Sequence, residues 1–180
     1  MRKINLSLTV FTAIFCITLF FPLTADAQKK RDYLTEEEIE LVRNNQLIDL
    51  RIGILTKAID RRFAVLKNQT PKEKEEWGAL PKGTRVELLI DIEKLLGKAI
   101  EDIDLVAERA KDSKLFPKAV NKLAGSCTEY LPQFNSFLDT TKEEKERGAL
   151  LGSIASCNDV IEASTKVPKE PAKEEKKKKN

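Results

Sequence analysis

Apolar residues between positions 35 and 165 recur every three or four places, which is the period of an amphipathic helix. Thr35 and Glu38 have the spacing of a capping box, the pair that begins a helix. Beyond them one apolar face repeats through residues 48–66, and Thr70 with Pro71 marks a break. We therefore predict a first helix that runs from Thr35 to about residue 66.

Three more helices follow by the same reasoning. Thr84 and Glu87 form a second capping box, Ser113 can cap a third helix, and a fourth begins near Thr141. Pro132 lies inside the third and should kink that helix or end it early. The residues expected to face inward on these helices are Ile92, Leu96, Ala99, Ile103, Val106 and Ala110, then Phe116, Val120, Leu123, Cys127, Tyr130, Phe134 and Phe137, then Leu150, Ile154, Cys157 and Ile161.

No segment alternates polar and apolar residues as a half-buried strand would. Four amphipathic helices, two of them joined by a short connection, predict an all-α fold, an antiparallel four-helix bundle with up-down-up-down topology. The bundle occupies residues 35–165 as one domain, after a short lead at residues 28–34.

The beginning of the chain indicates export. Two basic residues precede an apolar run over residues 6–23, and Ala25-Asp26-Ala27 supplies the small residues that a signal peptidase reads. We predict a signal peptide over residues 1–27, cleaved after Ala27 and before Gln28, and a periplasmic or extracellular protein with no transmembrane segment in the mature chain. The alternative is an uncleaved membrane anchor, since the apolar run is just long enough to span a bilayer.

The end of the chain carries the excess positive charge. The whole chain has a net charge of +3, while residues 166–180 contain seven lysines and three glutamates. Such a segment buries too little apolar surface to fold, so we predict a disordered tail and expect no nucleic acid partner. The run Lys176, Lys177, Lys178 and Lys179 is a candidate tether to an anionic surface. The alternative is a solvated C-terminus with no binding role.

Several chemistries are excluded by composition. The chain has no histidine and no C-x-x-C pair, which removes histidine-dependent catalysis, haem ligation by histidine and a four-cysteine zinc site within one chain. Its seven glycines are scattered and form no phosphate-binding loop. We therefore expect no catalytic residue, no metal and no cofactor, and the prediction is that the chain is not an enzyme.

Two cysteines remain after signal cleavage, Cys127 and Cys157, and both fall on inward faces. In an oxidising compartment an even pair favours a disulfide, which is our leading prediction, provided the helix register brings the two close enough. Two free buried thiols are the alternative, and a reactive role is the third, because a catalytic thiol should be partly exposed beside a cation or helix N-terminus.

Asn45 and Asn158 lie close to the apolar faces of the first and fourth predicted helices. In the predicted topology they could share one buried layer with both cysteines. The favoured interpretation is a hydrogen-bonded polar pair that fixes the register of the helices, and the other is a polar spot that holds a ligand.

These observations favour a non-enzymatic binding or structural protein of the periplasm or cell envelope, whose partner is a protein or an envelope surface. The alternative is a carrier that holds a small apolar ligand or lipid between its helices.

Overall fold

The computed structural model describes residues 31–72, 74–109 and 114–168. The predicted signal peptide with its cleavage site after Ala27, the cap at Ser113 and the lysine run from Lys176 to Lys179 lie outside the described residues. Within them the chain forms five α-helices, one 3-10 helix and no strand, so the all-α prediction is confirmed. The elements are α2 (Glu36–Asn44), α3 (Ile48–Leu66), η1 (Glu75–Trp77), α4 (Arg85–Arg109), α5 (Leu115–Thr140) and α6 (Glu144–Ser164).

The predicted first helix is two helices. Its start is as expected, because the Thr35 amide donates to Glu38 at 3.0 Å and the Glu38 amide donates to the Thr35 hydroxyl at 3.3 Å. The helix stops at Asn45, whose side chain donates to the Leu41 carbonyl at 2.8 Å, and the backbone is extended at Leu47. Asparagine competes for backbone hydrogen bonds in this way, which explains the break and corrects the single-helix prediction.

Two further sequence features, the capping box at Thr84 and the proline at position 132, predict helix boundaries. The second capping box is confirmed, because Thr84 and Glu87 exchange hydrogen bonds of 2.7 Å and 3.3 Å. Pro132 does not end its helix early, because α5 continues past it to Thr140; the other half of that prediction, a kink at Pro132, stays a prediction.

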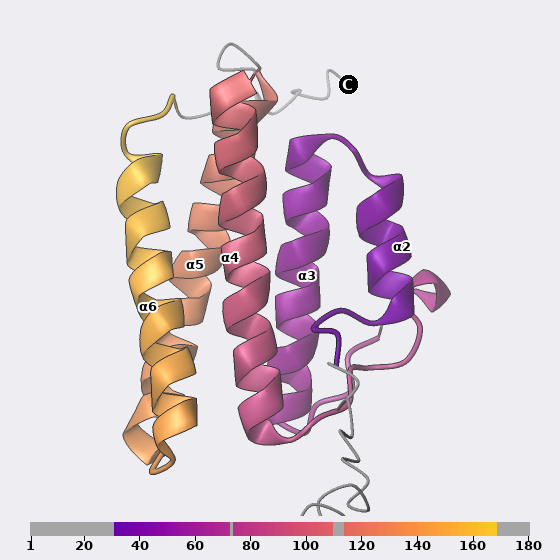
Figure 1. Ribbon diagram of the computed structural model, residues 1–180, viewed down its shortest axis with the longest axis vertical. Coiled ribbons are helices and arrows are strands. Elements are labelled where there is room, and N and C mark those ends of the chain that lie inside the picture. The colour runs from indigo at the N-terminus through magenta and orange to yellow at the C-terminus, as the bar shows by residue number, and fades with distance from the viewer. Residues whose placement is uncertain (1–30, 73, 110–113, 169–180) are drawn as a thin grey trace, which may run out of the picture. The chain divides into compact units, whose positions relative to one another are not determined.

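Helices α3 to α6 run in alternating directions along one another (Figure 1). α3 packs mainly against α4 and α5, and α6 packs mainly against the same two helices. α4 and α5 touch to a smaller extent, and among the described residues α3 and α6 have no close backbone contact. Consecutive helices therefore do not all lie side by side, and the first long helix does not face the last.

One apolar core joins these four helices. Most of the predicted inward positions of α4 and α5 are among its buried residues, and so are Leu150 and Cys157 of α6. The predicted inward residues Val106, Phe116, Phe137, Ile154 and Ile161 are only partly buried against the core, and Ala110 lies outside the described residues. The fully buried members are Ile52, Leu55, Ala58, Ile59, Ile92, Leu95, Leu96, Ala99, Ala119, Leu123, Cys127, Phe134 and Cys157.

The folded part extends beyond the predicted boundary at residue 165. Val167 is partly buried and packs against the core, and the Asn121 side chain donates to the Pro168 carbonyl at 3.1 Å. Residues 166–168, which the sequence pattern assigns to the tail, are therefore part of the helical body.

Candidate ligand-binding groove

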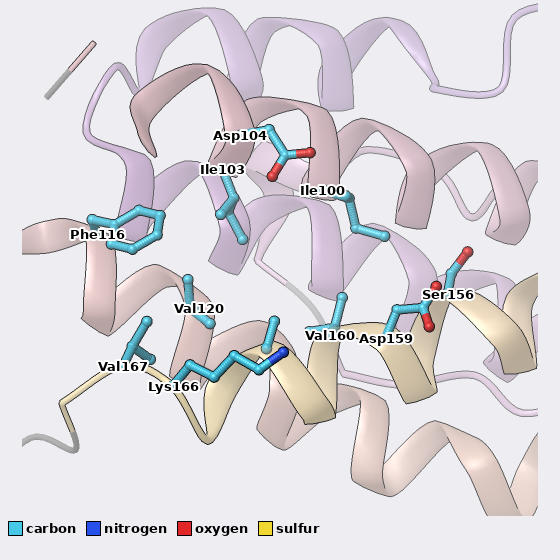
Figure 2. Close-up of a pocket in the computed structure, with 11 residues that line it drawn as sticks. Ile100, Ile103, Asp104, Phe116, Val120, Ser156, Asp159, Val160, Lys166 and Val167 are labelled. Atoms are coloured by element: carbon cyan, nitrogen blue, oxygen red, sulfur yellow. The ribbon is translucent and has the colours of Figure 1, made fainter. Parts of the chain in front are cut away.

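An apolar groove lies between the last turns of α4, the first turns of α5 and the last turns of α6 (Figure 2). Its volume is about 320 Å³. We call it the α4–α5–α6 groove, and its lining residues are Ile100, Ile103, Asp104, Phe116, Val120, Ser156, Asp159, Val160, Ala163, Lys166 and Val167.

The walls of the groove are an extension of the core. Ile103, Val120 and Val160 are buried members of the core cluster, and Ile100 and Phe116 are partly buried against it. α4 and α5 touch only to a small extent, and the groove lies where α5 begins. An apolar group that entered would remove these surfaces from water, and the volume is at the lower end of the range of small-molecule sites.

The polar groups of the groove stand at its rim. Lys166 is paired with Glu162 at 2.8 Å, and this hydrogen-bonded ion pair raises the pKa of Lys166 and lowers the pKa of Glu162. Asp104 and Asp159 are exposed, and neither has an ion-pair partner among the described residues. Ser156 is the remaining polar group of the lining. The rim thus holds two exposed carboxylates that form no ion pair with another described residue.

Cys127 and Cys157 do meet in the core, as predicted, but as free thiols. The hydrogen bond with the Cys157 thiol, and then burial, raise the pKa of Cys127. The leading prediction of a disulfide is therefore not what the structure shows: both cysteines are buried and free. Because a raised pKa suppresses the nucleophilic thiolate, Cys127 is poorly suited to a reactive role.

The predicted layer of Asn45 and Asn158 does not form. Asn158 is exposed on α6, and Asn45 ends α2 with its side chain on its own helix. The prediction is wrong for two reasons: Asn158 follows Cys157 directly and so points about 100° away from the core, and α3 and α6 are not neighbours.

A buried ionic cluster, which the sequence pattern did not reveal, joins α2 to α3. Arg62 donates through its two terminal nitrogens to the two carboxylate oxygens of Glu38, at 2.6 Å and 2.7 Å. Arg61 donates to the same carboxylate at 2.6 Å, and these three side chains are at most 1% exposed. Such a bidentate, charge-assisted arrangement is strong and geometrically specific.

Other hydrogen bonds from these two arginines hold the flanking loops. Arg61 also donates to the carbonyls of Gly78 and Ala79, at 3.2 Å and 2.6 Å, and Arg62 donates to the Tyr33 carbonyl at 2.6 Å. The segments before α2 and after η1 are thereby fixed on α3. The cluster is closed to solvent, so we interpret it as a structural clamp and not as a binding site.

The sequence pattern predicted neither the clamp nor the α4–α5–α6 groove. Both depend on contacts between segments that are distant in the sequence. The available signal for the clamp was the pair Arg61 and Arg62 beside the inward residues Ile59 and Phe63. For the groove no local signal existed, because its residues continue the ordinary apolar faces of three helices.

Neither a membrane span nor a metal cluster is found in residues 31–72, 74–109 and 114–168. No helix there is both long and apolar enough to cross a bilayer. No group of three or more Cys, Asp or Glu side chains in these ranges is arranged to hold a metal ion.

Comparison of the chain with protein-family models, with curated protein sequences and with solved structures gives no match.

Proposed function

We propose that this chain is an exported, non-enzymatic binding protein that holds an apolar group of its ligand in the α4–α5–α6 groove. The observation that carries the proposal is the groove itself, whose walls of Ile100, Ile103, Phe116, Val120 and Val160 are apolar and whose rim opens to solvent. In this proposal α3 to α6 act as an antiparallel four-helix scaffold, and the ligand binds at one end of it and not within its filled centre.

Export and the absence of catalysis belong to the same proposal. Export is supported by the basic start, the apolar run over residues 6–23 and the site at Ala27. A non-enzymatic role is supported by the lack of histidine and by the raised pKa of the buried Cys127 thiol, which leave few groups able to act as base or nucleophile near neutral pH.

The test is calorimetric titration of residues 28–180 with 1-octanol, an uncharged apolar probe. Ala163 is exposed and lines the groove, so Ala163→Trp should fill it and abolish binding. Ala155 is also exposed on α6 but does not line the groove, so Ala155→Trp is the matched control and should bind as the unmodified protein does. Absence of binding to the unmodified protein, or equal binding by both variants, would contradict the proposal.

A second candidate function, binding to an anionic envelope surface, is favoured by one further observation. Leu47 and Leu50 are 54% and 45% exposed at the start of α3, and Leu105 is 37% exposed near the end of α4. These positions lie at the end of the helical body where α6 also ends (Figure 1). The sequence after the last described residue, Pro168, is rich in lysine. Apolar side chains together with lysines are the combination that holds proteins at anionic interfaces.

Truncation tests this candidate, and the structure places the cut after Pro168 because residues 166–168 pack on the body. The truncated protein should keep its helical circular dichroism and its unfolding midpoint but bind less to vesicles that contain phosphatidylglycerol. Equal retention of the truncated and full-length mature proteins would exclude the tail, including Lys176 to Lys179, as a tether.

A further inference from the structure

Resting on the proposed function, we infer that the α4–α5–α6 groove takes a small cationic amphiphile, an apolar chain that ends in an ammonium group. The chain would lie along the apolar walls, and the ammonium would lie at the rim beside Asp104 and Asp159. The inference depends on which charges surround the groove and which of them are already paired.

The two ends of the groove differ. In Figure 2 Phe116 and Val167 lie at one end of the groove and Ser156 and Asp159 toward the other, while Asp104 lies between Phe116 and Ile100, beside Ile103. A ligand with one polar and one apolar end therefore has a defined orientation, with its chain toward Phe116 and its head toward the carboxylates.

The charges at the rim favour a cation. Asp104 and Asp159 come from different helices, and neither has an ion-pair partner among the described residues. The nearby cation, Lys166, is bound to Glu162 at 2.8 Å. An ammonium group would thus meet two carboxylates that pair with no described cation, and a carboxylate head would be repelled by them and would have to displace Glu162 from Lys166.

The experiment compares three probes of equal chain length, octylammonium, 1-octanol and octanoate, by calorimetric titration of residues 28–180 at low ionic strength. We expect octylammonium to bind about three- to ten-fold more tightly than octanol, which is the effect of one or two solvent-exposed charge pairs, and octanoate to bind most weakly. The preference for octylammonium should shrink in 1 M salt because these pairs are screened.

The double variant Asp104→Asn/Asp159→Asn should bind octylammonium and octanol with nearly equal affinity. The matched control is Glu129→Gln/Asp139→Asn, which removes two exposed carboxylates of α5 that do not line the groove. This control should keep the preference, since the net charge of the protein changes equally in both variants.

The outcomes separate this inference from the proposed function. If octanol binds but octylammonium is not preferred, or if the Asp104→Asn/Asp159→Asn variant keeps the preference, the cationic ligand is excluded and an apolar groove remains. Tighter binding of octanoate than of octylammonium would also exclude the cationic ligand and leave an apolar groove. If none of the three probes binds, the proposed function itself fails, and the inference fails with it.

Discussion

At one end of the helical body, around Arg61 and Arg62, charged side chains are buried and joined to Glu38 by short hydrogen bonds. At the other end, buried and half-buried apolar side chains line the open α4–α5–α6 groove, and the carboxylates of Asp104 and Asp159 stand at its rim without a described partner. Charged side chains usually face water and apolar ones are usually buried, so both ends of the helical body depart from the usual arrangement.

The comparison shows what each end is able to do. Buried charges are tolerated only when they are paired and hydrogen-bonded, so the clamp end must stay closed and its role is stability. Apolar walls open to water gain free energy when something covers them, so the groove end is the part suited to binding. The predictions below test this division, from the largest effect on stability to the smallest.

The largest effect is expected at the clamp. Glu38→Gln removes the charge that two buried guanidinium groups share, and it should lower the free energy of unfolding by about 3–5 kcal/mol, measured by urea denaturation. Glu40→Gln is the control, because Glu40 pairs with Arg43 on the exposed face of α2 and should matter by less than about 1 kcal/mol. A similar small loss in both variants would mean that the clamp contributes little stability.

A smaller effect is expected at Asp49, a buried carboxylate near the start of α3 whose Oδ2 lies 2.8 Å from Lys118 Nζ. The hydrogen bond from Lys118 holds the pKa of Asp49 below its usual value. A lowered pKa contributes stability that is present above the unfolded-state pKa, about 3.9, and is lost as pH falls through the folded-state value.

Asp49→Asn should therefore lower the free energy of unfolding by about 1.5–3 kcal/mol at pH 7, with a much smaller difference at pH 2. Urea denaturation at both pH values measures this. The same loss at both pH values would show that the charge of Asp49 is not what stabilises the fold.

The reactivity of the two thiols tests whether the core of the molecule stays closed to solvent. Cys127 and Cys157 are fully buried, and the raised pKa of Cys127 keeps its thiolate scarce at neutral pH. We expect residues 28–180 to have the mass of two free thiols, with alkylation by iodoacetamide slow in buffer and fast in urea. A mass lower by two hydrogens would show the disulfide instead, and fast alkylation in buffer would show that the core opens readily.

The smallest effect on stability is expected in the groove. Ala163→Trp should cost less than about 1 kcal/mol, because the site is exposed and tryptophan is only a somewhat poorer helix former than alanine. Ala155→Trp carries the same helix-propensity cost and should give the same midpoint in urea. A loss of several kcal/mol at position 163 alone would mean that this position supports the fold and does not line an open groove.

What could be predicted from the sequence was local. The capping boxes at Thr35 and Thr84 follow from spacing over three residues, and the inward faces of α4 and α5 follow from helical period, so both appear in the structure. The break at Asn45 was missed because the apolar pattern resumes in phase after it.

What could not be predicted depends on contacts between distant segments. Glu38 pairs with Arg61 and Arg62, which lie more than twenty residues away in the sequence, and the residues next to Glu38 do not predict that pairing. The groove lies between α4, α5 and α6, and helix period alone does not determine which helices become neighbours. The prediction for Asn158 was wrong for the same reason, because it assumed that the first and the last helix are neighbours.

The most direct test of the binding groove is an amide chemical-shift map of ¹⁵N-labelled residues 28–180 during titration with 1-octanol. The account predicts that saturable shifts gather at Ile103, Phe116, Val120, Val160 and Val167, while Arg61 and Arg62 stay unchanged. Shifts that are absent, that never saturate, or that gather around the clamp would contradict it.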